Sequence, residues 1–241
     1  MARKGNMYDK TIHSEFLKEE MVIKIYEPAE TDPLHENYVC IMQDGDDYFQ
    51  LGRVATVSDQ LHDTDDIVNT TFVGIHYIDR LDRLKKYHPD GEQFEAYIRF
   101  LIKEVIPLLD DVLPLNPLGT VRTLIGDSLA GTIALLTALR HPNMFKKVII
   151  QSPLVDEAVL KATEQCEEIR GIEVYHSIGL KETAVATTID DKFDFLKPNK
   201  QLSNILTEKL TTYHYQEIEE GNHTWKFWQK ELPNVLKLML T

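Results

Sequence analysis

Short apolar runs alternate with longer, helix-like stretches along most of the chain. Five of these runs are rich in β-branched and other apolar residues, which is typical of buried strands: residues 38–42, 72–76, 121–125, 148–152 and 172–178. The stretch from Gln93 to Leu109 instead places apolar residues at intervals of three and one, as an amphipathic helix does. The alternation predicts an α/β fold, with a mostly parallel central sheet covered by helices on both faces.

The remaining segments complete this architecture. They comprise two antiparallel opening strands around 12–16 and 22–26 after a loose start over 1–10, helices at 54–61, 157–169, 200–210 and 225–240, and a last strand at 213–218. Residues 43–47 are expected to form a turn and residues 79–89 a charged loop, each after a strand. Pro107 is expected to kink the helix over 93–109 or to end its regular part, whereas the last helix is expected to continue through Pro233.

The composition is that of an ordinary globular chain. Hydrophobic residues make up 43% of the 241 residues and charged residues 27%, so we expect one domain over residues 1–241. The chain has 39 acidic and 26 basic side chains and a net charge of −13. Such a charge is unfavourable for binding nucleic acid or an anionic membrane surface, and we expect neither partner.

The chain shows no sign of a targeting segment or a metal site. Its N-terminus lacks the apolar stretch that follows the basic residues of a signal peptide, and no apolar run is as long as a membrane span. Cys40 and Cys166 are far apart and lack the spacing of a disulfide scaffold or a zinc site. We therefore expect a cytoplasmic protein that uses no metal and no cofactor.

A Gly-x-Ser-x-Gly motif follows the strand at 121–125 and opens a helix. It reads Gly126-Asp127-Ser128-Leu129-Ala130-Gly131. In this context the motif builds a sharp turn that presents the serine hydroxyl above a sheet, and glycine avoids crowding where the backbone reverses. Free N–H groups at the helix start can then face a developing oxyanion. The alternative is a structural role for Ser128 as the N-cap of the helix.

The base that would activate this serine is expected to be a histidine, because its pKa is near neutral. Three histidines lie well downstream of Ser128 on the C-terminal strands and loops: His176, His214 and His223. His176 and His214 fall within predicted strands, whereas His223 follows the last strand in a Gly-Asn-His loop. The serine–acid–histidine order of this motif places the base after that strand, so we predict His223.

The acid of the same order is expected in the loop after the strand at 172–178. Glu182 is the first carboxylate there, and Asp190, Asp191 and Asp194 follow as competitors. A carboxylate fixes the tautomer of the imidazole and stabilises the imidazolium.

Two backbone amides are expected to form the oxyanion hole. One is the N–H of Leu129, the residue after the serine. The other comes from the 44–47 turn, with Asp46 as the predicted donor.

Several of these segments resemble the putative-esterase family, which includes esterase D and the enterochelin esterases and has the α/β-hydrolase fold. The similarity extends from about Tyr38 to Trp228 and is carried by Met42-Gln-Asp-Gly-Asp, Arg83-Leu-Lys-Lys-Tyr-His-Pro, Gly126-Asp-Ser-Leu-Ala-Gly, Gly179-Leu-Lys-Glu and Gly221-Asn-His-Thr-Trp. The resemblance implies a triad of Ser128, Glu182 and His223. Members of the family act on siderophore esters, acylated sugars, S-formylglutathione and simple esters, so the resemblance indicates the reaction and not the substrate.

The predicted function is hydrolysis of a small-molecule carboxylic ester by a serine esterase, through an acyl-enzyme. A thioesterase or an acyltransferase would use the same triad, and both stay open as alternatives. A catalytically silent hydrolase fold used for binding is a third reading, which is disfavoured because all three triad positions are filled. The sequence also leaves open whether the chain forms a homodimer.

Overall fold

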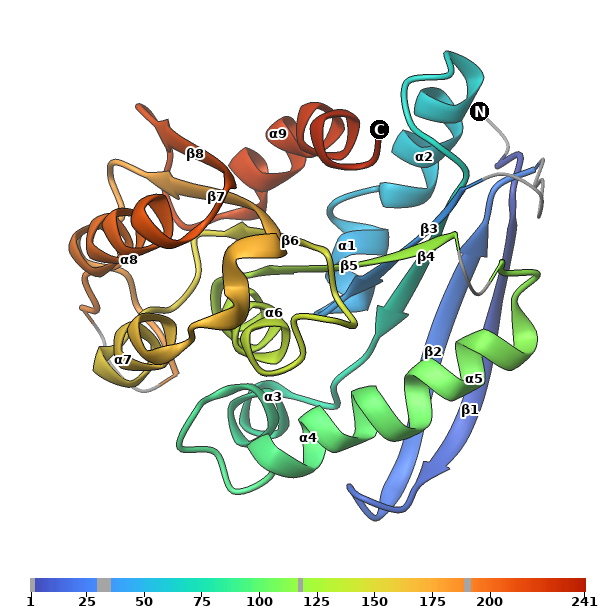
Figure 1. The fold of residues 1–241 in the computed structure, drawn as a ribbon, viewed down its shortest axis with the longest axis horizontal. Helices are drawn as coiled ribbons and strands as arrows, with labels where there is room; N and C mark the ends of the chain where they lie inside the picture. Colours follow the sequence, from blue (N-terminus) through green and yellow to red (C-terminus); the bar gives the residue numbers. More distant parts are fainter. Residues whose placement is uncertain (1–2, 30–35, 117–118, 189–191) are drawn as a thin grey trace.

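The computed structural model describes residues 3–29, 36–116, 119–188 and 192–241. Its strands are β1 (Asn6–Ser14), β2 (Glu19–Glu27), β3 (Asn37–Met42), β4 (Thr70–Ile75), β5 (Thr120–Asp127), β6 (Lys147–Gln151), β7 (Glu173–Gly179) and β8 (Thr212–Ile218). Within the described ranges they form one eight-stranded sheet in the order β1-β2-β4-β3-β5-β6-β7-β8 (Figure 1). β2 pairs antiparallel with β1 and β4, and all other neighbours are parallel. The predicted α/β fold with a mostly parallel sheet is confirmed.

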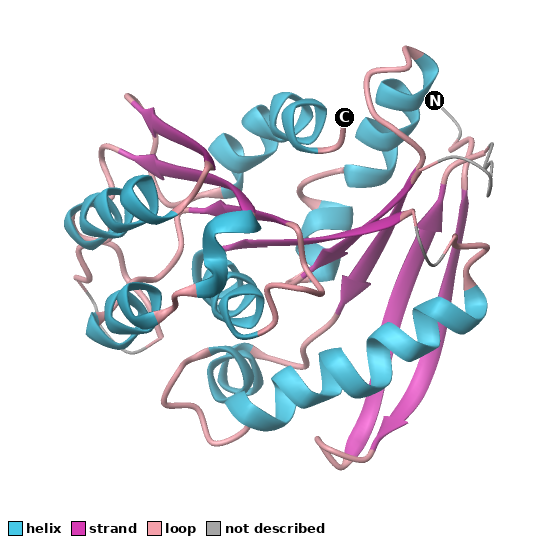
Figure 2. Ribbon diagram, in the orientation of Figure 1, coloured by secondary structure: helices cyan, strands magenta, loops and turns pink. Residues whose placement is uncertain are grey.

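Helices cover both faces of this sheet (Figures 1 and 2). One face is covered by α3 (Arg80–Tyr87), α4 (Phe94–Phe100), the π-helical turn η1 (Leu101–Val105), α5 (Ile106–Val112), α6 (Ser128–Arg140), α7 (Glu157–Gln165) and α8 (Leu196–Lys209). The other face is covered by α1 (Gly45–Gln50), α2 (Val54–Asp63) and α9 (Trp225–Met239). A short 3₁₀ helix, η2 (Glu168–Gly171), precedes β7. None of the helices in the described ranges combines the length and the apolar character needed to cross a membrane.

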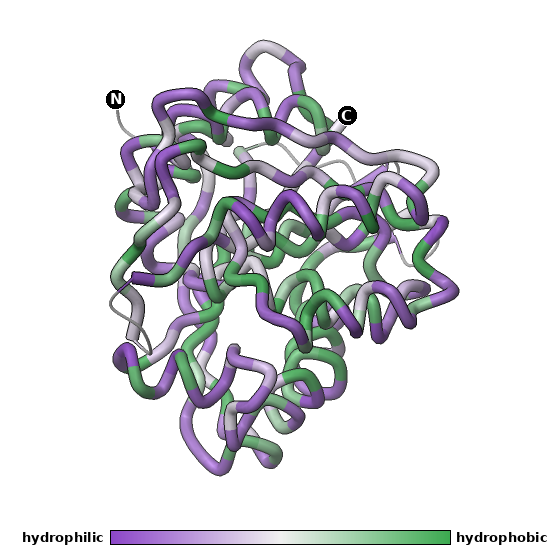
Figure 3. The backbone as a smooth tube through the Cα atoms, turned by 90° about the vertical axis from the view of Figure 1, so that its left-hand side faces the viewer, coloured by the Kyte–Doolittle hydropathy of each residue, from purple (hydrophilic) through white to green (hydrophobic). Residues whose placement is uncertain are grey.

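The central strands are buried on both faces, which explains why they read as continuous apolar runs. Along β3, Val39 and Ile41 pack under α4–α6, whereas Tyr38, Cys40 and Met42 pack under α1, α2 and α9. Each face of the sheet thus has its own hydrophobic core. In Figure 3 the hydrophobic segments run mainly through the interior of the molecule.

The charged segment 79–89 was expected to be a loop and is instead helix α3, so that prediction is wrong. Asp79 caps the helix, because its Oδ1 accepts hydrogen bonds from the backbone N–H groups of Leu81 and Asp82 at 2.8 and 2.9 Å. Lys86 is buried and pairs with Asp82, with Nζ 2.7 Å from Oδ1, and also with Glu19. One side of this helix faces inward, but it includes charged residues, so the hydrophobic pattern of the sequence does not indicate it.

Several other boundaries differ from expectation: the helix expected over 157–169 ends at Gln165, and the helix expected over 200–210 begins at Leu196. The predicted turn at 43–47 becomes helical from Gly45, and β1 begins at Asn6 within the expected loose start. The helix expected over 93–109 is confirmed and runs to Val112. A π-helical turn precedes Pro107, and the N–H of Ile106 bonds to the carbonyl of Leu101. Because Pro107 lacks an N–H, the widened turn adapts the hydrogen-bond ladder just before it.

Helix α1 begins in direct contact with β4. A Cβ built on Gly45 would lie 2.3 Å from the Cα of Gly74, and one on Gly74 would lie 2.9 Å from Cε2 of Phe49. Two glycines therefore allow the backbones of α1 and β4 to approach closely. This contact sets where the loop between β3 and α1 lies relative to the sheet.

We predict that Gly45→Ala lowers the free energy of unfolding by about 1–3 kcal/mol, because the new methyl group overpacks this contact. Urea denaturation measures the change. Gly171→Ala is the control, since nothing lies within 4 Å of a Cβ there, and it should stay within about 0.5 kcal/mol of the parent. Equal stability of the two variants would contradict the close approach.

Candidate active site

The predicted serine motif forms a sharp strand-to-helix turn. β5 ends at Asp127 and α6 begins at Ser128, whose φ of 52° lies in the left-handed region. A Cβ built on Gly126 would lie 2.2 Å from the carbonyl oxygen of Ala130, so only glycine fits there. The turn predicted from the sequence is confirmed, with a strained backbone at the serine itself.

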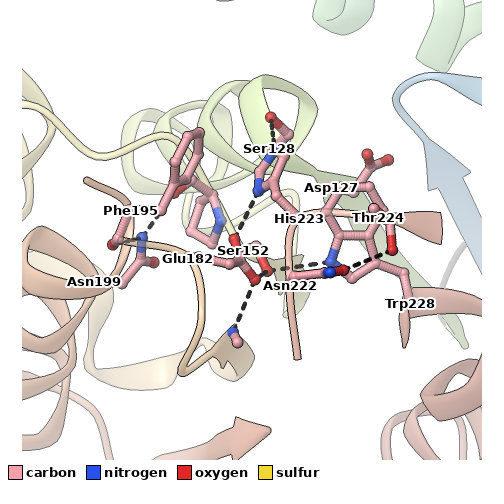
Figure 4. Close-up of polar contacts among 12 residues, drawn as sticks. Asp127, Ser128, Ser152, Glu182, Phe195, Asn199, Asn222, His223, Thr224 and Trp228 are labelled. Carbon is pink, nitrogen blue, oxygen red and sulfur yellow. Dashed lines mark hydrogen bonds and ion pairs between the residues drawn. The ribbon is translucent and has the colours of Figure 1, made fainter. Parts of the chain in front are cut away.

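Ser128, His223 and Glu182 form a continuous hydrogen-bonded chain (Figure 4). Nε2 of His223 lies 2.8 Å from Oγ of Ser128, and Nδ1 lies 2.6 Å from Oε2 of Glu182. The serine follows β5, the acid follows β7 and the histidine follows β8, so all three sit at the carboxyl ends of parallel strands. The structure thus brings together the three residues that the sequence predicted, and their catalytic roles are taken up below.

Two side chains that the sequence analysis missed hold Glu182 in place. Its Oε1 accepts hydrogen bonds from Oγ of Ser152 at 2.7 Å and from the N–H of Gly179 at 2.9 Å. Nε1 of Trp228 in turn donates to Oγ of Ser152 at 3.1 Å. With Oε1 occupied in this way, Oε2 is left to face His223. Ser152 directly follows β6 and has a positive φ of 46°, a feature that sequence alone does not reveal.

The rings around His223 restrict its position. The ring of Phe195 lies 4.2 Å from that of His223, and the ring of Trp228 lies 5.0 Å from it in an edge-to-face arrangement. Both distances are between ring centroids. The N–H of Phe195 also bonds to the carbonyl of Glu182 at 2.9 Å, so the acid and the aromatic wall belong to one unit.

Asp194, the one competing acid that the structure describes, does not take part in the hydrogen bonds that link Glu182, His223 and Ser128. Asp194 is exposed, and its Oδ1 accepts a hydrogen bond from the N–H of Lys197 at the start of α8. Asp190 and Asp191 lie outside the described residues.

The other two candidate histidines have structural partners away from Ser128. His176 is fully buried, with Nε2 2.7 Å from Oδ1 of Asn199 and Nδ1 2.8 Å from the hydroxyl of Tyr213. His214 pairs with Glu173 near the amino ends of β7 and β8. Their places within strands, as predicted from the sequence, thus keep them from the serine.

A pocket of about 390 Å³ opens beside Ser128 and His223. Its wall is polar on the side of α1 and α3 and includes apolar and aromatic residues elsewhere. The lining residues are Asp44, Asp47, Tyr77, Arg80, Arg83, Leu84, Asp127, Ser128, Leu129, Leu154, Ala186, Thr187, Thr188, His223, Thr224, Trp225 and Trp228. A pocket of this size suits a small ligand that reaches the serine hydroxyl.

The two predicted oxyanion donors lie at helix starts. Leu129 lines the pocket in the first turn of α6, and Asp46 lies in the first turn of α1. Amides of a first turn lack the usual intrahelical acceptor. The Asp46 side chain does not line the pocket and instead places Oδ2 3.2 Å from Nδ1 of His76. A role for the backbone amide of Asp46 stays a prediction, as does that of Leu129.

No group of three or more His, Cys, Asp or Glu side chains is arranged to hold a metal ion among the described residues.

Comparison with known proteins identifies a family that matches most of this chain. The family described as "Putative esterase" matches residues 14–239. "Uncharacterized protein YjcH" of Bacillus subtilis (strain 168) is 42% identical over 238 residues, which cover 99% of either chain.

Solved structures of esterases share the fold. An enterochelin esterase from Shigella flexneri matches with a TM-score of 0.80 at 19% identity, covering 98% of this chain and 59% of its own. A ferulic acid esterase matches with a TM-score of 0.76 at 14% identity, covering 98% of both chains. An IroE-like serine hydrolase from Shewanella oneidensis has a TM-score of 0.77 at 18% identity, covering 97% of this chain and 79% of its own. This chain thus has the predicted α/β-hydrolase fold, and it spans about three-fifths of the length of the enterochelin esterase.

We predict that His176 makes the protein less stable as the pH falls. Burial lowers the pKa of His176 to about 4, so below the ordinary value of 6.5 the unfolded chain takes up a proton that the folded chain does not. Between pH 7 and pH 5 this uptake should cost about 2 kcal/mol of unfolding free energy. Urea denaturation at the two pH values, with His176→Gln beside the parent, measures the contribution. A pH dependence that His176→Gln leaves unchanged would show that His176 titrates normally.

Proposed function

The chain belongs to the family described as "Putative esterase", and from that membership we propose that it is a carboxylic ester hydrolase with a Ser128–His223–Glu182 triad. The observation that carries the proposal is the hydrogen-bonded chain from Glu182 through His223 to Ser128, at 2.6 and 2.8 Å. A structural N-cap serine requires no such chain. The left-handed turn exposes the same hydroxyl to the pocket.

The reaction begins with acylation of the serine. Nε2 of His223 accepts the proton of Ser128 as Oγ attacks the ester carbonyl carbon, and the carbonyl oxygen becomes an oxyanion. The N–H of Leu129 and the N–H of Asp46 are the proposed donors to that oxyanion. His223 then gives its proton to the departing alcohol, which leaves an acyl group on Oγ.

Deacylation repeats the same steps with water. His223 accepts a proton from the attacking water, and the second oxyanion forms in the same place. Its collapse returns the proton to Ser128 and releases the carboxylic acid. The same acyl-enzyme would form from a thioester, and an alcohol could replace water as the acceptor. A substrate panel therefore has to identify both the acyl donor and the acceptor.

Glu182 acts through the histidine. Its Oε2 accepts the Nδ1–H of His223, which leaves Nε2 free to accept the serine proton, and its charge stabilises the imidazolium that follows. Ser152 and Gly179 hold the other oxygen, so the carboxylate cannot rotate without losing two hydrogen bonds. This arrangement fixes the tautomer before substrate binds.

The solved esterases that share this fold suggest which esters to include in a substrate panel. An enterobactin esterase and a ferulic acid esterase share this fold. A catecholate siderophore ester and a feruloyl ester therefore belong beside short acyl esters, acetylated sugars and thioesters.

We predict that the purified protein hydrolyses p-nitrophenyl acetate or butyrate and that Ser128→Ala lowers kcat/KM by on the order of 10⁴-fold or more, because the nucleophile is lost. Release of p-nitrophenol measures the rate. Leu129→Ala is the matched control: it removes a neighbouring side chain and keeps the backbone amide, so it should retain substantial turnover. Comparable losses in two folded variants would contradict the assignment of Ser128.

We predict that Glu182→Gln lowers kcat/KM by about 10³- to 10⁴-fold, since the side chain keeps its size but loses both tautomer control and the charge that stabilises the imidazolium. The same p-nitrophenyl assay measures it. Asp194→Asn, a neutralised carboxylate in the same loop region, should leave kcat/KM within about twofold, as expected for a surface change away from the site. A large loss of kcat/KM in Asp194→Asn, together with an unchanged kcat/KM in Glu182→Gln, would show that Asp194 and not Glu182 is the acid.

A further inference from the structure

Arg83 of α3 reaches across the pocket wall to two separate loops. Its Nε lies 2.9 and 2.8 Å from Oδ1 and Oδ2 of Asp44, and its Nη2 lies 2.5 Å from Oδ2. The same Nη2 donates to the backbone carbonyl of Asp127 at 3.3 Å. One guanidinium therefore joins the loop after β3 to the residue immediately before Ser128.

We propose that Arg83 is a positioning residue of the oxyanion hole. It fixes the spacing between the start of α1 and the Ser128 turn, so that backbone amides from both can face one substrate oxygen. The proposal rests on the proposed esterase function, and it adds a residue that acts without touching the reacting atoms.

Both loops that Arg83 joins carry strained backbone. Asp44 has φ 58° and Ser128 has φ 52°, and neither is glycine. Such conformations cost free energy and persist only where surrounding contacts impose them. At the Ser128 turn, the absence of a side chain on Gly126 leaves room for the close approach of Ala130. At Asp44 the side chain is held by the guanidinium.

The ion pair joins a buried carboxylate, Asp44, to a largely covered guanidinium, Arg83, whose side chain is 17% exposed. Asp44 is 2% exposed, and Arg83 lies 5.8 Å from the ring centroids of both Tyr77 and Tyr87. Burial raises the pKa of the Asp44 carboxyl, and the nearby Arg83 charge opposes that rise. The Asp44 N–H faces the hydroxyl of Tyr87 at 3.5 Å, so the loop is held from both its backbone and its side chain. A lysine could neutralise Asp44 but lacks the planar fork that reaches both loops.

The geometry matters because the two proposed oxyanion donors come from different elements. The amide of Leu129 moves with α6 and the amide of Asp46 moves with α1. Donors stabilise the transition state only when they lie close to the position of the developing oxyanion. A small shift of one loop against the other would therefore weaken catalysis and leave ground-state binding largely intact.

The test compares two ketone inhibitors, of which one forms an oxyanion on binding and the other does not. With a trifluoromethyl ketone, Oγ of Ser128 bonds to the carbonyl carbon, the serine proton passes to His223, and the carbonyl oxygen becomes an oxyanion. The matching methyl ketone binds without this step. The main variant is Asp44→Asn/Arg83→Gln, which removes both charges of the ion pair at once, so that neither member of the pair is left charged without the other. Arg83→Lys is the second variant, and it keeps the charge that balances Asp44.

We expect the double variant to lower kcat for p-nitrophenyl butyrate by on the order of 10²-fold with KM within about threefold, as for loss of one oxyanion donor. The inhibition constant of the trifluoromethyl ketone should rise by a similar factor, and that of the methyl ketone should not. Arg83→Lys should show the same selective pattern to a smaller extent. All assays are run on variants whose thermal melts show folded protein.

A matched control lies at the opposite end of β5. Nη2 of Arg122 lies 2.5 Å from Oδ1 of Asp110, remote from the pocket, so Asp110→Asn/Arg122→Gln should leave kcat unchanged. Unchanged kcat in the Arg83 variants, or equal weakening of both ketones, would overturn the positioning role. Absence of ester hydrolysis in the parent protein would instead overturn the proposed function.

Discussion

Ser128 adopts a left-handed backbone at the point where β5 becomes α6, and the rest of the site depends on that turn. The turn is possible because Gly126 and Gly131 let the backbone of the elbow pack closely, with a Cβ on Gly131 only 2.9 Å from the carbonyl of Gly126. The strain is confined to a buried junction between a central strand and its helix, where packing on both sides holds it. The hydroxyl consequently lies at the end of the sheet, within reach of loops that follow β7 and β8.

A parallel sheet places the carboxyl ends of its strands along one edge, and the described site uses this property throughout. Ser128, Ser152, Glu182 and His223 each follow a different strand from β5 to β8. Their hydrogen bonds therefore also tie neighbouring loops together, from Trp228 of α9 to the serine turn. Arg83 extends the same principle to the loop after β3. Geometry at the serine thus depends on contacts made by several segments that are far apart in the sequence.

The sequence predicted the positions of Ser128, Glu182 and His223, because their order along the chain follows the order of the strands that carry them. The glycines around Ser128, the position of Glu182 after one strand and of His223 after the next were all readable from spacing. Helix α3 was not, because charged side chains such as Arg83 and Lys86 are largely or fully covered there and pair with carboxylates, which a hydrophobic pattern cannot show. Ser152 and Trp228 were missed for a related reason, since the bonds from Trp228 to Ser152 and from Ser152 to Glu182 join residues that are distant in sequence.

The central claim is that Glu182 and His223 make the hydroxyl of Ser128 a nucleophile. Labelling with a fluorophosphonate, followed by peptide mass spectrometry, tests it most directly, because the adduct is stable and identifies the serine. The account predicts one phosphonyl group per chain, on Ser128, and a much slower reaction in His223→Ala. Labelling of another residue such as Ser152, or labelling that does not depend on His223, would contradict it.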